Sequence, residues 1–112
     1  MITLSLPPTD NHIYLQKGKM KFMCREAKDW KEQAQWEFKS QYKGKLQTGD
    51  VEIGKIIFYL KHWRDIQGSL KLIFDAAEEI VYNNDRQVVM FGPVIRKTDK
   101  ENPRVEIEIV NY

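Results

Sequence analysis

The chain has 112 residues, of which 42% are hydrophobic and 30% charged, which suits one small packed domain over residues 1–112. Its longest uninterrupted apolar run, residues 56–60, is too short to cross a membrane, and no secretory signal is visible. The single cysteine, Cys24, excludes an internal disulfide and a multi-cysteine zinc site, so we expect a cytoplasmic protein. Residues 1–49 hold nine basic and five acidic side chains, whereas residues 50–112 hold nine and eleven. The basic first half is therefore a candidate surface for an anionic partner.

The first half of the chain predicts a strand, a hairpin and a helix. Residues 2–6 alternate apolar and polar side chains, as a half-buried strand does, and Pro7-Pro8 ends the pattern. Two short segments, residues 12–14 and 20–23, indicate a hairpin around residues 16–19. A helix is expected over residues 25–43, where an apolar stripe recurs at three- and four-residue spacing: Ala27, Trp30, Ala34, Phe38 and Tyr42.

The second half predicts strands around one further helix. Residues 51–60 favour a strand that is continuously apolar from Ile56, so we expect a central strand covered on both faces. A helix should follow from about residues 66–69 to Val81, then a strand over residues 87–95 that Gly92-Pro93 interrupts. Residues 105–109 alternate as a last strand. The order predicts an α+β fold, with two helices packed on one mixed or antiparallel β-sheet.

Asp65 lies among basic residues where the strand ending at Leu60 gives way to the second helix. An acid in that setting suits a divalent cation beside a phosphate, because Mg²⁺ takes carboxylate, water and phosphate oxygens. Asp85 is the natural second carboxylate: if the strand after it lies beside the strand ending at Leu60, its loop could bring Asp85 near Asp65. Lys71, which shares a helix face with Gln67, would then stabilise phosphoryl charge or orient an attacking water.

Each of these residues also has a purely structural interpretation. Asp65 could be the N-cap of the second helix. Lys71 and Asp75, four residues apart, could form an exposed ion pair. Asp85 could be ordinary turn chemistry after Asn83-Asn84.

Other reactive or exposed side chains give weaker signals. His12 and His62 have no Cys or His partner at metal-ligand spacing, and Cys24 has no evident triad partner. Trp36 falls off the apolar stripe, and an exposed tryptophan can mark an interface. A protein-interaction domain that uses Trp36 is therefore one hypothesis for the function.

Basic side chains gather in two places that could follow a phosphate backbone. One group surrounds the predicted hairpin, and the other flanks the start of the second helix. The candidate DNA-binding residues are Lys17, Lys19, Lys21, Arg25, Lys61 and Arg64.

Four short blocks occur in an informative order: residues 6–14, with Pro7-Pro8-Thr9-Asp10-Asn11; residues 64–71, from Arg64-Asp65 to Lys71; Phe74-Asp75-Ala76; and residues 81–88, with Asp85-Arg86-Gln87-Val88. Through these blocks, nearly the whole chain resembles the RusA family of Holliday junction resolvases of bacteria, prophages and phages. That family shows a Pro-Pro-Ser-Asn-Asn-type start, an Asp-x-Asp-[Asn/Gly]-x-x-Lys block, Phe-Asp-Ala and a later Asp-Asp-x-Gln-[Val/Ile].

The resemblance implies a homodimeric, Mg²⁺-dependent endodeoxyribonuclease of DNA recombination and repair, with Mn²⁺ as a substitute metal. Such enzymes bind four-way DNA junctions and cut paired strands symmetrically. The family holds its metal with three aspartates and uses one lysine. Asp65 matches the first aspartate, Asp85 the third, and Lys71 the lysine, so the resemblance assigns catalysis to these three residues.

The second aspartate of the family falls on Gln67, and Asn84 replaces an acid beside the third. An amide oxygen can ligate Mg²⁺, but it is neutral and cannot act as a base. Three interpretations stay open: an active enzyme whose metal is held by Asp65, Gln67 and Asp85; a weakened or inactive relative that only binds branched DNA; and a sequence altered at this position.

Overall fold

A five-stranded mixed sheet frames the computed structural model, which describes residues 1–9, 14–17 and 20–110. Strand β4 (Val51–Leu60) is central and pairs antiparallel with β7 (Arg104–Ile109), which in turn pairs with β1 (Ile2–Leu4). On its other side β4 pairs in parallel with β5 (Val88–Phe91) and then with β6 (Val94–Thr98). The predicted α+β fold with a mixed sheet is confirmed, and β4 has the predicted bounds.

Gly92 and Pro93 divide the strand that was predicted over residues 87–95, and both pieces stay beside β4. The Gly92 amide donates to the carbonyl oxygens of Ile53 and Gly54, at 2.8 and 3.0 Å, and the Ile56 amide donates to the Pro93 carbonyl. A Cβ atom on Gly92 would lie 2.9 Å from the Gly54 backbone carbonyl group. Only glycine allows this close approach of two backbones. Gly92 therefore allows β5 to end and β6 to begin while both strands stay paired with β4.

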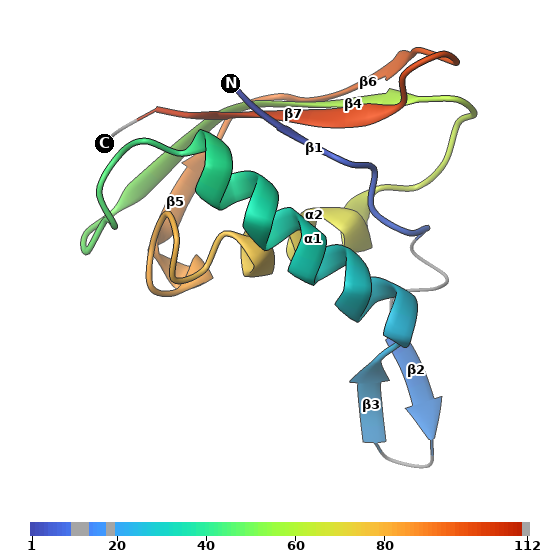
Figure 1. Cartoon of the computed structure of the whole chain (residues 1–112), viewed down its shortest axis with the longest axis horizontal. Helices are drawn as coiled ribbons and strands as arrows, with labels where there is room; N and C mark the ends of the chain where they lie inside the picture. The colour runs from blue at the N-terminus through green and yellow to red at the C-terminus, as the bar shows by residue number, and fades with distance from the viewer. Residues whose placement is uncertain (10–13, 18–19, 111–112) are drawn as a thin grey trace.

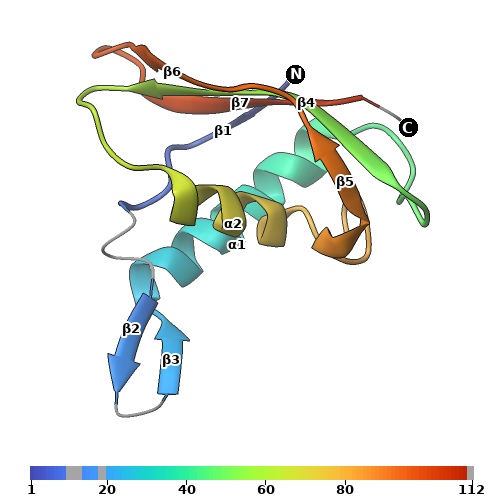
Figure 2. The same ribbon diagram turned by 180° about the vertical axis from the view of Figure 1, so that it is seen from behind.

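Helices α1 (Arg25–Gln41) and α2 (Gln67–Ala76) lie on the same face of the sheet, as Figures 1 and 2 show from opposite sides. The predicted apolar stripe of α1 is confirmed, because all five of its residues are buried. The helix is also bonded to the first strand and the segment after it. The side chain of Gln41 bonds both backbone polar groups of Thr3, and the Trp30 indole donates to the Ser5 carbonyl at 3.0 Å.

The expectation that β4 is covered on both faces is wrong. Both helices cover one face of the sheet, as Figure 2 shows. Ile56 and Phe58 belong to the core under the helices, and Ile57 between them belongs to the other face, since side chains alternate along a strand. Ile57 is nevertheless buried, and its cross-strand neighbours are Ile95 and Glu106. On the same face the Arg104 guanidinium covers the Tyr59 ring at 3.8 Å. Side chains of the sheet itself therefore shield apolar residues that no second layer covers in the described part of the chain.

Helix α2 ends at Ala76, not near Val81 as the apolar spacing predicted. Glu79 has a φ of 69°, a left-handed conformation that a continuing helix excludes. The segment that follows is held by other bonds: the Glu79 amide donates to the Tyr82 carbonyl, and the buried Tyr82 hydroxyl donates to the Phe74 carbonyl at 2.7 Å. Val81 and Tyr82 thus fill the core from a turn, which their periodicity could not distinguish from helix.

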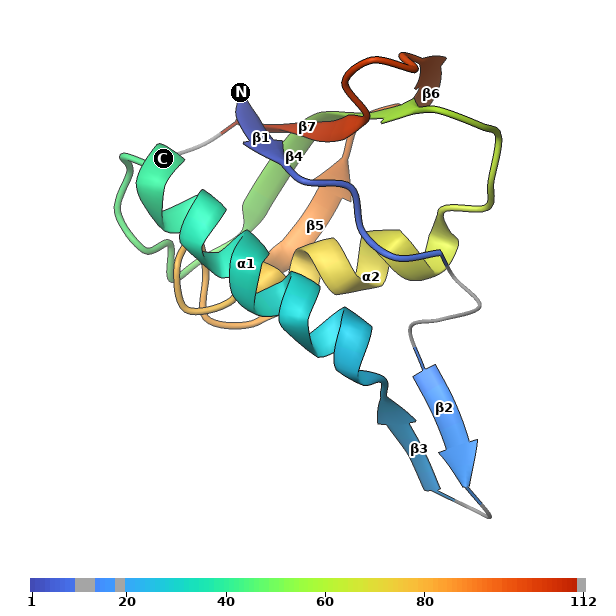
Figure 3. The ribbon, with the colours of Figure 1, turned by 45° about the vertical axis from the view of Figure 1, so that its right-hand side comes forward.

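The predicted hairpin exists, but its first strand is shifted. Strand β2 (Tyr14–Lys17) pairs antiparallel with β3 (Met20–Met23) as a separate two-stranded sheet. The first segment was expected at residues 12–14, and His12 lies outside the described residues. Figure 3 shows the hairpin extending away from the main sheet, beside the start of α1.

No helix within residues 1–9, 14–17 and 20–110 has the length and apolar character needed to cross a membrane.

Strand β6 continues to Thr98, beyond residue 95 where the strand was predicted to end. The polar turn that precedes β7 therefore begins at Asp99.

Candidate active site

Helix α2 aligns three polar side chains of the candidate site. Gln67, Lys71 and Asp75 follow one another at four-residue intervals, which places them along one face of the helix. Eight residues of α-helix rise by about 12 Å, so Lys71 stands halfway between the other two. From the sequence, Asp75 was expected as an exposed ion-pair partner of Lys71 and as part of the Phe74-Asp75-Ala76 block.

Asp85 approaches this helix from a well-fixed turn. It is the first residue of the short 3₁₀ helix η2 (Asp85–Gln87), where the Asn84 side chain accepts a hydrogen bond from the Arg86 amide at 2.9 Å. Gln87 completes the capping box and donates to the carbonyl oxygens of Gln47 and Gly49. The Asp85 amide also donates to the Glu78 carboxylate at 3.2 Å. These bonds fix the backbone from which the Asp85 carboxylate extends.

The Lys71 ammonium joins two carboxylates. Its Nζ lies 2.8 Å from Asp75 Oδ1 and 2.7 Å from Asp85 Oδ2. The lysine side chain is 57% exposed, but those of Asp75 and Asp85 are only 13% and 24% exposed. The carboxylates are thus the sheltered part of the cluster, and the lysine lies over them towards solvent.

The charges of this cluster stabilise one another. Hydrogen bonds to Asp75 and then to Asp85 raise the pKa of Lys71 above its usual value of 10.5. The bond from Lys71 is also the main cause that lowers the pKa of Asp85 below 3.8. At neutral pH the lysine is therefore protonated and Asp85 ionised, so the cluster combines one cation with two adjacent carboxylates.

The structure separates the alternatives that the sequence left open for these residues. The N-cap of α2 is Ile66, with no side-chain capping bond, so Asp65 does not cap the helix. The turn chemistry expected of Asp85 belongs to Asn84. The Lys71–Asp75 ion pair does form, but Lys71 shares its ammonium with Asp85.

The route by which Asp85 was expected to approach Asp65 is wrong. The strand after Asp85 does lie beside β4, as expected, but the pairing is parallel and its register sets Val88 beside Val51, the first residue of β4, and Thr98 beside Leu60, the last. Asp85 thus precedes the end of the sheet opposite to the one that Asp65 follows. It approaches the site only because α2 runs back beneath the sheet and carries Lys71 towards it. No hydrogen bond or ion pair joins Asp65 to Lys71 or Asp85 in the part of the chain that the structure describes.

Asp65 and Gln67 stand at the start of α2, and both are exposed. Their neighbour Arg64 is half-buried, and its Nη2 donates to the Pro7 carbonyl at 2.6 Å. This bond holds the N-terminal segment against the start of the helix. Lys61 and His62 are exposed on the preceding loop.

The basic residues of the first half have different surroundings. Lys17 and Lys21 lie on the hairpin strands, and Lys19 lies outside the described residues. Arg25 opens α1, is exposed, and reaches Asp29 at 3.9 Å.

Trp36 is 66% exposed on α1, with the Lys39 ammonium 5.3 Å from its ring centre, so its predicted exposure is confirmed. Cys24 forms no disulfide and is half-buried.

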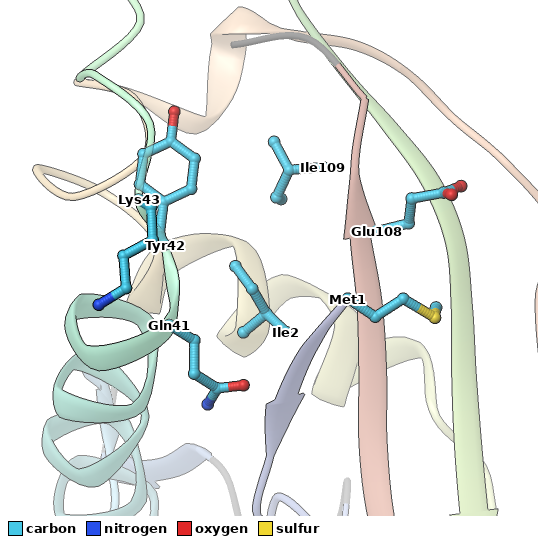
Figure 4. A pocket seen from close by; sticks show the side chains of 7 residues that line it. All are labelled: Met1, Ile2, Gln41, Tyr42, Lys43, Glu108 and Ile109. Carbon is cyan, nitrogen blue, oxygen red and sulfur yellow. The ribbon is translucent and has the colours of Figure 1, made fainter.

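A hollow of about 260 Å³ lies elsewhere on the molecule, as Figure 4 shows. It is lined by Met1, Ile2, Gln41, Tyr42, Lys43, Glu108 and Ile109, none of which is a candidate site residue. A smaller depression, whose lining includes Asp75, Glu78 and Asn83, borders the cluster around Lys71. The candidate chemistry therefore lies on an open surface, which suits a large substrate better than a small enclosed one.

Across residues 1–9, 14–17 and 20–110, no three His, Cys, Asp or Glu side chains gather in a way that could hold a metal ion. This finding does not cover the predicted ligand set, because that set has two acids and one amide. The four-residue spacing predicted the ion pair of Asp75 with Lys71, but not that Asp75 shares the lysine with Asp85. The contact of Glu78 with the Asp85 amide was not predicted, because no sequence pattern indicated it.

The family model described as endodeoxyribonuclease RusA matches residues 5–110 of this sequence. The chain belongs to the RusA endodeoxyribonuclease family. The match begins just after β1, spans every element from β2 to β7, and includes all the candidate site residues. A search of curated proteins gives no match to the chain. RusA membership implies a Holliday junction resolvase nuclease, which acts on branched DNA.

Proposed function

We propose that this RusA-family chain is a Mg²⁺-dependent endodeoxyribonuclease that resolves four-way DNA junctions by paired, symmetric phosphodiester hydrolysis. The observation that carries the proposal is the contact of Lys71 with Asp85, within a chain that matches the family over residues 5–110. The two residues are distant in sequence, and both occupy positions that the family resemblance assigns to catalysis. Mn²⁺ is expected to replace Mg²⁺.

The proposed metal ligands are Asp65, Gln67 and Asp85. Their carboxylate and amide oxygens are the hard donors that Mg²⁺ prefers, and waters and phosphate oxygens would complete its shell. Asp65 and Gln67 are exposed, and Asp65 has no ion-pair or hydrogen-bond partner among the described residues. The donor chemistry of this set therefore fits the ion. When bound, Mg²⁺ would lower the pKa of a coordinated water and offset the charge of the phosphate.

Lys71 would act on the reacting phosphate. Its ammonium is protonated at neutral pH, and its side chain is more than half exposed. A phosphodiester can therefore contact the ammonium without a rearrangement of the protein. A fixed positive charge stabilises the extra negative charge that a phosphate acquires as water attacks it. Asp85 would hold that ammonium in place from the protein side while also serving as a metal ligand.

Basic residues away from the cluster would hold the DNA backbone. Lys61 is exposed on the loop before α2, and Arg25 is exposed at the start of α1, next to the hairpin whose strands include Lys17 and Lys21. Lys19, which lies outside the described residues, belongs to the same proposed set of DNA-binding residues. Arg64 would contribute less, because its guanidinium already donates to the Pro7 carbonyl. Contacts of this kind position DNA without reading its sequence.

A homodimer is part of the same proposal. Two symmetric cuts in one junction require two sites related by a two-fold axis, and each chain carries one Lys71–Asp85 cluster.

A second candidate function is branched-DNA binding without cleavage, and Gln67 is the observation that favours it. A neutral amide replaces the second carboxylate of the family pattern, which weakens the attraction for a divalent cation. Such a protein would bind junctions in a salt-dependent way and release no products in Mg²⁺ or Mn²⁺.

Cleavage of an end-labelled four-way junction tests the proposed site. Asp65→Asn and Asp85→Asn should each abolish cutting and leave junction affinity within about threefold, since both substitutions keep the shape of the side chain. Asp50→Asn is the matched control, because Asp50 is an exposed acid in the loop before β4. Normal cutting by both site variants would reject the proposed site.

A further inference from the structure

Asp75 is the least exposed carboxylate that contacts Lys71, and the family resemblance assigns it no role. Its side chain is 13% exposed, against 24% for Asp85, and its Oδ1 lies 2.8 Å from the Lys71 ammonium. It stands one helical turn after Lys71, near the end of α2. A surface acid with only an incidental ion pair would be free to turn into solvent, but this carboxylate is sheltered and directed at the lysine.

A lysine in this position needs such a partner. Lysine has a flexible four-carbon stem, and an exposed ammonium can adopt many rotamers. Asp85 alone would restrain Lys71 from one side. Asp75 and Asp85 together restrain it from two, because one extends from α2 itself and the other from η2. The ammonium is thus confined to the point between them.

The turn between these two acids is also tied together. The Glu78 carboxylate accepts the Asp85 amide at 3.2 Å, and the Glu78 amide donates to the Asp75 backbone carbonyl at 3.2 Å. Glu78 therefore connects the end of α2 to the start of η2. The Glu78 side chain and backbone thus help to fix the spacing of Asp75 and Asp85, which does not depend on Lys71 alone.

We propose that Asp75 is a positioning residue that holds the Lys71 ammonium beside Asp85, and that junction cleavage by this chain depends on it. This inference rests on the proposed function for its effect on cleavage. Asp75 touches neither the phosphate nor the metal in this account and acts only through Lys71.

The first test follows the Lys71 ammonium itself, in metal-free protein, by ¹⁵N NMR of the lysine side chains. In the unmodified protein its protons should exchange slowly, because two carboxylates accept them. The signal should broaden or vanish in Asp75→Ala and remain in Asp99→Ala, which removes an Arg104 ion pair of 2.9 Å elsewhere. An unchanged signal in Asp75→Ala would overturn the inference.

The second test measures single-turnover cleavage and junction affinity side by side. Asp75→Ala should cut about ten- to a hundredfold more slowly, a typical penalty for a misplaced catalytic group, with junction affinity within about twofold. Asp75→Glu should recover both the ammonium signal and part of the rate. Cutting at the unmodified rate by Asp75→Ala would overturn the inference. So would equal losses of cutting and binding, or a Glu variant that regains the signal but not the rate.

The two tests keep the inference separate from the proposed function. If the unmodified protein cuts no junction, the proposed nuclease activity fails. The ammonium signal then still decides whether Asp75 holds Lys71.

Discussion

The Lys71 ammonium lies 2.7 Å from the Asp85 carboxylate, although the two residues are fourteen positions apart in the chain. The contact depends on the turn after α2, on the capping box at Asn84 and on the pairing of β5 with β4. Each of these features is local, but all of them are needed to bring Lys71 into contact with Asp85, the two residues that match catalytic positions of the family.

This contact predicts how the stability of the protein depends on pH. The pKa of Asp85 lies below its ordinary value of 3.8, chiefly because Lys71 bonds it, so the unfolded chain binds this proton more readily than the folded one. The stabilisation is present above about pH 4 and is lost as the pH falls through the folded pKa. Lys71→Met should therefore have a lower free energy of unfolding than the unmodified protein at pH 7. The difference between the two free energies should become smaller below pH 4.

Urea denaturation from neutral to acidic pH measures this gap. A difference that is constant with pH would mean that Lys71 stabilises the fold through its aliphatic stem and not through its charge. Asp50→Asn should give a curve parallel to that of the unmodified protein.

Arg64 and Lys61 should behave differently although both are basic residues before α2. Arg64→Ala removes a hydrogen bond from a half-buried guanidinium to the Pro7 carbonyl and should lower the free energy of unfolding by about 1–3 kcal/mol. Lys61→Ala should change stability by less than about 0.5 kcal/mol, because its side chain is exposed.

The same two variants should affect junction binding in the opposite order, with the larger loss of affinity in Lys61→Ala. Lys61→Ala should weaken it and reduce the dependence of log affinity on log salt by about one unit, the effect of one lost phosphate contact. A Lys61→Ala variant with an unchanged salt dependence would remove Lys61 from the DNA-binding surface.

Gly92 should not tolerate even a methyl group. A Cβ atom there would lie 2.9 Å from the Gly54 backbone carbonyl, so Gly92→Ala should cost about 1–3 kcal/mol of stability as the strands separate. Gly49→Ala is the control, because nothing lies within 4 Å of a Cβ at that position. Thermal denaturation of the two variants checks this, and equal midpoints would show that the strand edge adjusts without cost.

Trp36 tests the remaining idea of a protein-interaction surface. Its ring is 66% exposed, so Trp36→Ala should leave stability within about 0.5 kcal/mol of the unmodified protein. If the chain works on DNA as proposed, the variant should also cut junctions normally. A lost activity without lost stability would instead assign Trp36 to a functional surface.

The spacing of apolar residues predicted those elements whose local pattern is compatible with only one type of secondary structure. The stripe from Ala27 to Tyr42 allows only a helix, and residues 51–60 form the strand expected of them. Periodicity failed at Val81 because an apolar residue can enter the core from a turn as well as from a helix. It also failed at Ile57, where flanking side chains of the same sheet face supply the burial that a second layer was expected to give.

The candidate site residues were chosen from family resemblance more than from physical reasoning about spacing. Spacing alone left Asp65, Lys71 and Asp85 with structural interpretations of equal weight. The sequence suggested that the strand after Asp85 lies beside β4, but it did not give the direction or register of the pairing, which decide which end of β4 Asp85 approaches. The role of Asp75 depends on a side-chain contact between two segments, which a linear pattern does not encode.

The most direct measurement is cleavage of an end-labelled four-way junction in Mg²⁺ by the unmodified protein and by Gln67→Asp, resolved on a denaturing gel. The account predicts paired symmetric nicks from both proteins, with cutting by Gln67→Asp at lower Mg²⁺ because a carboxylate binds the ion more tightly than an amide. Nicks from Gln67→Asp alone would contradict it. They would mean that the scaffold and Lys71 are intact but that the natural chain binds branched DNA without cutting it.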